Sequence, residues 1–429
     1  MQLKPRSTSS VQAGYKQTEV GVIPEDWEAE DIKQLTDVRD GTHDSPKYAD
    51  NGVFFITSKN LINGRINFNN APLISESDAI EIDKRSKVHE GDILISMIGT
   101  VGNAALVNFV PNFCIKNVAL IKPYKSKVSS DYLIQLYRSK KYGEYIENKL
   151  DGGIQKFISL GVLRSTKIPL PPTKAEQEAI AGALSDADAW IESLEQLIAK
   201  KRRIKEGASQ ALLTGKQRLP GFTGDWEVKT VGEVILKSFC GPSPTCEEVN
   251  IQGNDEWGVL KTTAITWKDG WSWKKHKKLP TQYWGKTNIE IKYGDVLVTK
   301  AGPRHRVGVA AWVDFTPGHI IPSGKMICLR PKTGIILPML LASGIASEDA
   351  QSFLDQRTTG MAESQLNYEN KDLLDTPIQV PTKAEQTAIG EILSEMDAEL
   401  DALAGKLSKA RQIKQGMMQE LLTGKTRLV

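Results

Sequence analysis

The sequence of 429 residues has few cysteines and no long apolar run. Its four cysteines, Cys114, Cys240, Cys246 and Cys328, form no C-x₂-C pair and so lack the spacing of a cysteine zinc site. So few cysteines in a long chain favour a reducing compartment. No stretch approaches the ~18 apolar residues of a membrane span, and Met1 to Ser10 lacks the apolar core of a secretion signal. We therefore expect a cytoplasmic protein without a membrane partner.

Charge of one sign is not in excess either. The chain has 55 lysines and arginines against 52 aspartates and glutamates, a formal net charge of +3. This balance neither requires nor excludes a nucleic-acid partner, because local clustering of charge matters more than the total. The length is sufficient for about two to four domains.

Catalytic motifs are also missing. The five histidines are scattered, and none has a serine or cysteine nucleophile at a recognisable spacing. Glu290-Ile291-Lys292 has the form of a nuclease triplet but lacks an identifiable companion acid. Gly424-Lys425-Thr426 resembles the end of a phosphate loop, but Gln419 occupies the position of the required glycine. We predict a chain without catalytic residues, metal site or cofactor of its own.

What the sequence does contain is an internal repeat. Pro172–Gln177 recurs unchanged as Pro381–Gln386, and Leu212–Lys216 recurs as Leu421–Lys425. Both pairs of segments lie 209 residues apart. Two matches at one fixed period indicate a duplicated architecture.

Each copy of the repeat predicts one long helix. Thr173 with Glu176, and Thr382 with Glu385, have the spacing of a capping box, and no proline interrupts the ~40 residues that follow, which would span roughly 60 Å. Apolar residues then recur in steps of three and four, the pattern of a coiled-coil seam. The predicted helix-pairing residues are Ile180, Leu184, Ile191, Leu194 and Ile198 in the first copy and Ile389, Leu393, Met396, Leu400, Leu403 and Leu407 in the second.

The charges along the two helices favour an antiparallel pair. Each helix begins acidic and ends basic, as Glu176 to Lys205 and Glu385 to Lys414 illustrate. In an antiparallel pair the acidic half of each helix meets the basic half of the other. The alternative interpretation is that the gradient merely complements each helix's own macrodipole.

Two globular domains of similar length lie between and before the helices. Asp26-Trp27-Glu28 is echoed by Asp225-Trp226-Glu227, and Gly91–Ser96 by Gly294–Thr299, where Gly-Asp followed by β-branched residues predicts a turn into a strand. We predict an α+β fold in which two long antiparallel coiled-coil helices separate two globular domains in a pseudo-twofold, cyclic arrangement. The predicted bounds are 1–18 for an N-terminal tail, mobile or docked near the C-terminal helix, 19–171 for the first domain, 172–219 for the central helix, 220–380 for the second domain and 381–429 for the C-terminal helix.

This duplicated arrangement resembles the specificity subunit of type I restriction–modification systems. The likeness is carried by the two repeated helices, the two Gly-Asp-x-Leu strands, Ile23–Glu28 and Asp40–Pro46. The resemblance implies that each domain is a target-recognition domain reading one half of a split sequence in double-stranded DNA. It implies that the helices act as a spacer and carry two modification (methyltransferase) subunits, and that restriction (translocase and nuclease) subunits join them. S-adenosylmethionine, ATP and Mg²⁺ are then expected in those partner subunits.

Two alternatives come from other classes of protein. A coiled-coil scaffold that binds no DNA would have the same helices. A fused methyltransferase would need an Asn/Asp-Pro-Pro-aromatic motif, and Pro169–Pro172 lacks both the polar and the aromatic residue.

Base reading needs directed donors and acceptors on loops, and phosphate binding needs Lys, Arg or backbone N–H groups. In the first domain the loop bracketed by Gly41 and Pro46 is the main candidate; the same residues would otherwise be solvated loop positions. The candidates are Thr42, His43, Ser45, Lys47, Tyr48, Lys59, Asn60, Arg65, Thr100, Asn103, Gln155 and Lys156.

In the second domain, a lysine run follows Trp267, Trp271 and Trp273, an arrangement that suits a phosphate-facing ribbon. The tryptophans could equally be core residues and the lysines a solvated sheet edge. The turn Gly241–Pro244 is a possible counterpart of the His43 loop. The candidates are Lys261, Thr262, Thr263, Lys274, Lys275, His276, Lys300, Arg304, His305, Arg306, Ser364 and Gln365, of which the arginines are expected to read guanine.

Overall fold

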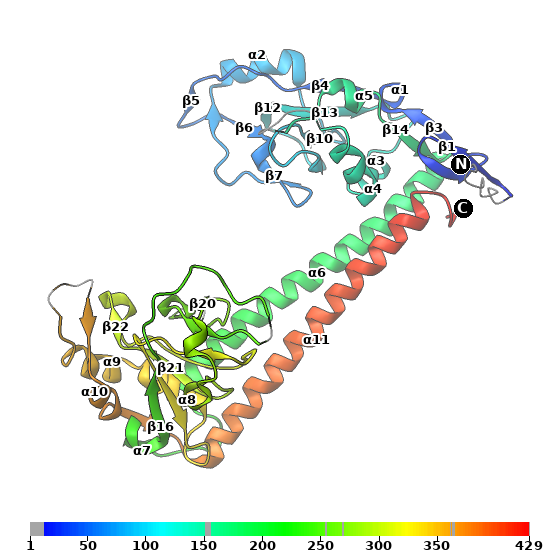
Figure 1. Ribbon diagram of the computed structural model, residues 1–429. Helices are drawn as coiled ribbons and strands as arrows, with labels where there is room; N and C mark the ends of the chain where they lie inside the picture. Colours follow the sequence, from blue (N-terminus) through cyan, green and yellow to red (C-terminus); the bar gives the residue numbers. More distant parts are fainter. Residues whose placement is uncertain are drawn as a thin grey trace, which may run out of the picture. The chain divides into compact units, whose positions relative to one another are not determined.

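The computed structural model describes residues 13–150, 156–253, 255–267, 270–360, 362 and 365–428. The chain divides into two compact units, unit 1 (Met1–Gln196 with Ala404–Val429) and unit 2 (Leu197–Leu403). Each unit contains a mixed β-sheet and helix part together with one portion of each of two long helices, α6 and α11 (Figure 1). Among the described residues, no helix has an 18-residue window apolar enough to cross a membrane.

Helices α6 (Lys174–Leu213) and α11 (Lys383–Leu421) begin and end at the predicted signals. The hydroxyl of Thr173 accepts a hydrogen bond from the N–H of Glu176 at 3.2 Å, and Thr382 caps α11 in the same way. Beyond the C-terminal ends, Gly215 and Gly424 have φ angles of 68° and 69°. Both are left-handed conformations that glycine adopts without a steric penalty.

Within each unit the two helices run antiparallel, as predicted from their charges. Positions that ascend along α6 pair with positions that descend along α11, which only an antiparallel pair allows. The ion pairs are Asp188–Lys414 (2.5 Å) and Glu195–Arg411 (2.6 Å) in unit 1, and Lys201–Glu399 (2.7 Å) and Lys205–Asp397 in unit 2.

The predicted helix-pairing residues lie on the covered side of each helix. Ile180, Leu184 and Leu421 share the core of unit 1, while Ile389 and Leu393 pack with Leu212 in unit 2. The buried members of the predicted seam are Ile180, Leu184, Leu194, Ile198, Ile389, Leu393 and Leu403. Those of intermediate exposure are Ile191, Met396, Leu400 and Leu407.

Unit 1 is built on two four-stranded sheets. The first is antiparallel, with strand order β11 (Ala104–Leu106), β10 (Ile93–Ser96), β13 (Val118–Pro123) and β4 (Thr36–Asp40). The second has the order β12 (Phe113–Lys116), β6 (Val53–Thr57), β9 (Leu73–Ile74) and β5 (Tyr48–Ala49), and its strands β12 and β6 are parallel. The helices are α1 (Ile32–Leu35), α2 (Glu76–Ser86), α3 (Ser130–Tyr137), α4 (Lys140–Glu147) and α5 (Leu160–Arg164).

Among the described residues of unit 1, three further pairs of strands are present. They are β1 (Tyr15–Thr18) with β2 (Gly21–Pro24), β3 (Glu28–Asp31) with β14 (Lys167–Leu170), and β7 (Leu61–Ile62) with β8 (Arg65–Ile66). A single 3₁₀ turn, η1 (Ser58–Asn60), connects β6 to the β7–β8 hairpin. Because parallel β6 and β12 end side by side, the segments that leave them meet at one edge of the sheet.

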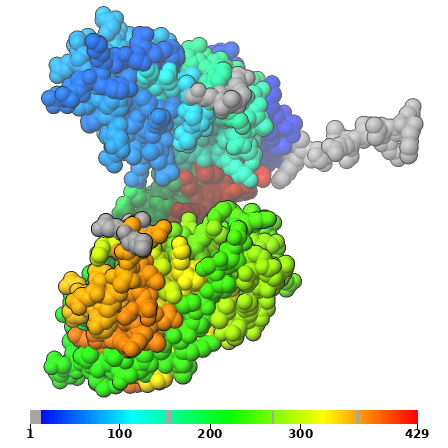
Figure 2. All heavy atoms as spheres, turned by 60° about the vertical axis from the view of Figure 1, so that its left-hand side comes forward, coloured from blue at the N-terminus to red at the C-terminus, as the bar shows by residue number. Residues whose placement is uncertain are grey.

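Unit 2 repeats this plan. Its antiparallel sheet has the order β16 (Ile235–Cys240), β25 (Met326–Pro331), β21 (Val296–Thr299) and β23 (Ala310–Trp312). Its second sheet has the order β20 (His276–Lys278), β17 (Gly258–Leu260) and β24 (Ile320–Ile321), with β17 and β24 parallel. In the space-filling view the elements between α6 and α11 form one continuous surface, coloured green to orange (Figure 2).

The remaining elements of unit 2 are short. Its helices are α7 (Val231–Val234), α8 (Pro338–Ile345), α9 (Glu348–Asp355) and α10 (Asn370–Leu374). Its two-stranded pairs are β15 (Glu227–Thr230) with β27 (Pro377–Val380), β18 (Ile265–Thr266) with β19 (Gly270–Trp271), and β22 (Ala301–Gly302) with β26 (Leu366–Asn367). Its 3₁₀ turns are η2 (Thr262–Ala264), η3 (Thr281–Tyr283), η4 (Thr287–Ile289) and η5 (Arg304–Arg306).

The two Gly-Asp motifs form the turns that were predicted to lead into strands. Gly91 and Gly294 have φ angles of 91° and 84°, and β10 and β21 begin two residues later. The buried carboxylate of Asp92 accepts from the N–H of His89 at 2.7 Å and pairs with Lys122 at 2.5 Å. Asp295 makes the equivalent bonds with Lys292 N–H and Arg330. Each aspartate thus ties the turn to the neighbouring strand.

The predicted N-terminal tail, residues 1–18, includes residues that are part of a strand. Tyr15–Thr18 pairs with Gly21–Pro24 as the hairpin β1–β2, so residues 15–18 belong to folded unit 1. The hydroxyl of Tyr15 donates to the backbone carbonyls of Gly424 and Lys425 at 3.4 and 3.3 Å. The hairpin therefore lies against the end of α11; the other predicted domain bounds stay predictions.

An arginine that bonds a buried glutamate lies at one end of the helix pair in each unit, and the sequence did not predict this interaction. In unit 1, Arg427 forms a two-pronged ion pair with the buried carboxylate of Glu176 and a second one with Asp26, and its guanidinium lies 5.8 Å from the ring of Trp27. The glutamate side chain of the predicted capping box therefore bonds an arginine.

The same arrangement recurs in unit 2. Arg218 pairs with the buried carboxylate of Glu385 at 2.5 and 2.7 Å, and the indole N–H of Trp226 donates to the same carboxylate at 3.1 Å. The sequence repeat therefore also repeats this ion pair between an arginine and a buried glutamate. We call the pairs Arg427–Glu176 and Arg218–Glu385 the Arg–Glu clasps.

Candidate DNA-binding surface

In unit 1, three segments converge at the carboxyl ends of the parallel strands β6 and β12. The N–H of Thr42 donates to the carbonyl of Ile115 at 3.1 Å, and the N–H of Asn117 donates to the carbonyl of Thr42 at 3.3 Å. The hydroxyl of Ser58, in η1, donates to the carbonyl of Asn117 at 3.0 Å. Residues 41–47, which we call the first recognition loop, therefore lie beside η1 and the end of β12.

Polar side chains of this edge form a network. The ring of His43 is 64% exposed, yet both its nitrogens are engaged, Nε2 at 2.8 Å from a carboxylate oxygen of Asp40 and Nδ1 at 2.8 Å from Oδ1 of Asn117. Arg85 pairs with the other oxygen of Asp40. His43 thus has no ring nitrogen left to read a base.

Several other predicted residues at this edge of the sheet have exposed side chains. Ser45 accepts a hydrogen bond from Lys116, a cation that is not among the predicted DNA-contacting residues. Lys47 and Lys59 are exposed and form no side-chain hydrogen bond or ion pair with any described residue. Tyr48 is 67% exposed.

Asn60 and Asn103 are occupied inside the fold, in contrast to their predicted role. Asn60 is only 7% exposed, accepts from the N–H of Thr57 at 3.0 Å and donates to the carbonyl of Asn67 at 3.0 Å. Asn103 donates to the carbonyl of Leu61 at 3.0 Å. Both amides hold the β7–β8 hairpin in place, the buried one of Asn60 and the half-buried one of Asn103.

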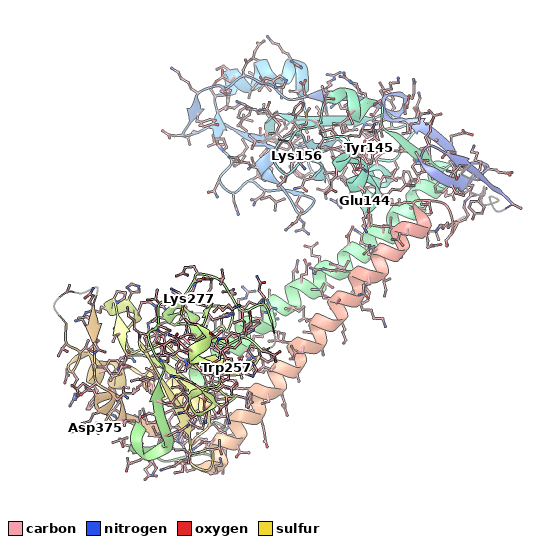
Figure 3. The ribbon with its side chains drawn as sticks, viewed as in Figure 1. Glu144, Tyr145, Lys156, Trp257, Lys277 and Asp375 are labelled. Carbon is pink, nitrogen blue, oxygen red and sulfur yellow. The ribbon has the colours of Figure 1, made fainter. Side chains whose placement is uncertain are left out.

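Arg65, beside the tip of that hairpin, pairs with Glu192 of α6. The ion pair raises the pKa of Arg65 and lowers that of Glu192. Thr100 lies exposed in the turn after β10, and its carbonyl accepts from Ser96. Lys156 is exposed (Figure 3), and Gln155 lies outside the described residues.

Unit 2 places its counterpart loop at the equivalent edge. A Cβ added to Gly41 would lie 2.3 Å from the carbonyl oxygen of Ile115, and one added to Gly241 would lie 1.6 Å from that of Pro322. Only glycine permits this close approach of loop and strand in each unit. Residues 241–247 thus form the second recognition loop.

Lys261 lies at the carboxyl end of β17, as Lys59 does near the end of β6. It pairs with Glu248 at 2.8 Å, and Lys277 of β20 pairs with the same carboxylate. Their hydrogen bonds lower the pKa of Glu248 to about 2. Thr262 and Thr263 follow in η2, half-buried and exposed respectively.

The lysine run separates into exposed and buried members. Lys274 and Lys275 are exposed, and neither side chain bonds another described residue. His276, in contrast to its predicted role, is 1% exposed, stacks on Trp273 and accepts from the N–H of Ile251 at 3.0 Å. His276 and Lys277 are consecutive on β20, so their side chains point to opposite faces of the strand, and only that of His276 is buried.

The tryptophans before the lysine run also differ in exposure. Trp267 is 50% exposed, whereas Trp271 packs against the core and donates its indole N–H to the carbonyl of Phe315 at 2.9 Å. The exposed side chains of this segment thus suit a phosphate-facing ribbon, whereas Trp271 is packed against the core as the alternative interpretation expected.

The arginine candidates also differ from one another. Arg304 and His305 are exposed in η5, where Arg304 lies 3.6 Å from Asp355. Arg306 donates to the carbonyls of Thr262 and Ile265, so its guanidinium holds η2 and not a base.

The last three candidates of unit 2 lie in other segments. The backbone N–H of Lys300 donates to the carbonyl of Lys325 at 3.0 Å, and the Lys300 side chain is half-exposed. Gln365 is exposed, and Ser364 lies outside the described residues.

Two unlike loops on a repeated α+β plan, each joined to part of a helix pair, give this chain the architecture of a duplicated recognition protein. The family model of the type I restriction modification DNA specificity domain matches residues 24–201 and 223–412, so this chain belongs to that family. It is one of the specificity subunits of type I restriction–modification systems, which recognise DNA, assemble with the other subunits of the system and are not catalytic. The alternative of a scaffold that binds no DNA is therefore not favoured.

Individual relatives agree with this assignment. The type I restriction enzyme EcoEI specificity subunit of Escherichia coli is 29% identical over 249 residues, which cover 55% of this chain and 41% of that protein. The match thus spans less than half of that relative. The putative type I restriction enzyme MjaX specificity subunit of Methanocaldococcus jannaschii is 25% identical over 451 residues, which cover 96% of this chain and 97% of that protein.

Solved structures show the same fold. The type I restriction–modification S subunit from M. genitalium has a TM-score of 0.50 at 16% identity and covers 92% of this chain and 96% of its own. A chain from a study of complex assembly and conformational transition of the type I R-M system has a TM-score of 0.58 at 16% identity, with 94% and 99% covered.

Proposed function

We propose that units 1 and 2 each read one half of a bipartite, asymmetric DNA site. The observation that carries this proposal is the recurrence of one loop position with different side chains. In both units the loop after a glycine lies at the carboxyl ends of two parallel strands. The first loop offers Ser45 and Lys47, whereas the second contains Pro242 and Pro244. Equal placement with unlike chemistry suits two readers of different half-sites.

The long helices would set the gap between the half-sites and dock two modification subunits. Support comes from apolar side chains that the helix pair leaves uncovered. Trp190 and Ile204 of α6 are each 46% exposed. Large apolar side chains on the outside of a helix are available to a partner protein. In the assembled enzyme, S-adenosylmethionine would belong to the modification subunits, and ATP and Mg²⁺ to the restriction subunits.

Salt dependence of DNA binding tests the proposal. In complex with the modification subunits, the double variant Lys274→Ala, Lys275→Ala should bind every duplex more weakly, and the slope of log K against log salt should fall by about two units. Arg304→Ala should instead relax one base position, since an Arg fork pairs with guanine. Fluorescence anisotropy on specific and random duplexes measures both effects.

Lys371→Ala provides the matched control, because Lys371 is an exposed cation of unit 2 that lies in α10. Its slope should equal that of the unmodified chain. An unchanged slope for the double lysine variant would remove these lysines from the DNA-binding surface. A complex that binds all duplexes equally would contradict the proposed function itself.

A further inference from the structure

Asn117 occupies an unusual place at the end of β12. Its φ angle is 53°, in the left-handed region that few residues other than glycine and asparagine adopt. Its backbone N–H donates to Thr42, its carbonyl accepts from Ser58, and its side chain bonds His43. One residue therefore binds the first recognition loop and η1 at the same time.

The side chain of Asn117 completes a brace across the loop. Asp40 precedes the loop and its carboxylate can only accept, so the Nε2 of His43 carries the hydrogen that it donates at 2.8 Å. Asn117 holds the opposite nitrogen at 2.8 Å. A ring held at both nitrogens cannot turn, and the backbone of His43 is fixed with it. The loop residues that follow, Ser45 and Lys47, are then presented in one geometry.

Unit 2 stiffens its loop by a different means. Gly324 is the backbone counterpart of Asn117, because its N–H donates to the carbonyl of Pro242 at 3.0 Å as that of Asn117 donates to Thr42. Gly324 has no side chain, and a Cβ there would lie 2.2 Å from the hydroxyl of Ser243. The second loop instead contains Pro242 and Pro244, whose rings fix φ. Each unit thus restricts its loop, unit 1 with a side-chain brace together with Pro46, and unit 2 with two prolines and no brace from Gly324.

We propose that Asn117 is a positioning residue for DNA reading by unit 1, and that His43 is the strut through which it acts. This inference rests on the proposed function of the two units. It assigns His43 a place inside the loop and leaves contact with bases to the side chains beyond it. Reading by a rigid loop discriminates better, because the wrong base cannot be accommodated by rearrangement.

The test compares Asn117→Gly with His43→Ala and with the double variant, each in the complex with modification subunits. Glycine keeps the left-handed backbone and removes the brace at its Asn117 end, whereas alanine at position 43 removes the ring through which Asn117 acts. The measured quantity is discrimination, the affinity for the cognate duplex divided by that for duplexes with one base changed in either half-site. Arg304→Ala, in unit 2, marks the half-site that the other unit reads.

We expect Asn117→Gly to lower discrimination about tenfold in the half-site that Arg304→Ala leaves intact. Affinity for random duplexes and the thermal midpoint should stay unchanged. His43→Ala should lower discrimination in the same half-site by a similar factor, and the double variant should lose no more than either single variant, because Asn117 acts through His43.

Two outcomes would overturn the inference while the proposed function stands. One is a glycine variant that discriminates as well as the unmodified chain, and the other is a loss in the half-site that Arg304→Ala affects. An unmodified complex that discriminates in neither half-site would contradict the proposed function, and the role of Asn117 with it.

Discussion

At the scale of single residues, the buried carboxylates of Glu176 and Glu385 stand out because each depends on one arginine. Their side chains are 1% exposed, and Arg427 and Arg218 supply the compensating charge. A buried carboxylate without a partner is costly, since it loses its hydration and gains nothing in return. Each arginine therefore stabilises the fold mainly because its removal would leave a buried carboxylate without a partner.

Arg427→Ala should destabilise the start of α6 by about 3 kcal/mol, because it leaves Glu176 buried and unpaired. Arg411→Ala is the matched control, since Arg411 and Glu195 form an exposed pair on the same helices whose loss should cost less than about 1 kcal/mol. Hydrogen exchange of the amides in residues 174–190 measures both opening free energies. Equal protection in the two variants would show that the clasp contributes no more than a surface ion pair.

Roles of single residues were the least predictable part of the candidate surface. The threonine caps could be predicted because the cap and its partner lie three residues apart. The partner of Glu176 lies 251 residues away, beyond any local pattern. His276 and Arg306 looked like ligands for DNA by residue type, but tertiary packing directs both side chains inward.

At the scale of elements, two glycines near the C-terminal end of α6 have opposite effects on stability. Gly207 lies inside the helix, and a Cβ added there would meet no atom within 4 Å. Gly215 lies beyond the helix end with φ of 68°, and an added Cβ would lie 3.2 Å from the ring of Trp226. The first glycine weakens the helix, whereas the second allows the chain to turn out of it.

Substitution by alanine should therefore have opposite signs at these two positions. Gly207→Ala should stabilise unit 2 by up to about 1 kcal/mol through helix propensity. Gly215→Ala should destabilise it by about 1–2 kcal/mol, because alanine is strained in the left-handed region. Urea unfolding followed by circular dichroism compares the two variants. Changes of the same sign would mean that the helix does not end where the structure places its end.

Long helices were predictable and short strands were not. The limits of α6 and α11 follow from capping threonines, glycines and apolar spacing within one segment. Strands such as β9 and β24 have two residues each and form only because they pair with distant segments. The parallel edge that carries the recognition loops could not be foreseen for the same reason.

At the scale of the whole molecule, the sequence period of 209 residues corresponds to two units built on one plan. Each unit has an antiparallel sheet, a sheet with one parallel pair, a loop at its edge and an Arg–Glu clasp. Under the proposed function, duplication of the scaffold with divergence of the loops would give one chain two different DNA specificities. The helices shared by the two units would then set the gap between the half-sites.

Methylation mapping of a genome that carries this chain with its modification subunits tests this most directly. The unmodified chain should yield one asymmetric motif, split into two unlike half-sites by a gap of unspecified bases. A chain with one helical turn inserted into α6 and α11 should change the length of the gap and neither half-site. A continuous motif, or half-sites whose sequences change with helix length, would contradict the account.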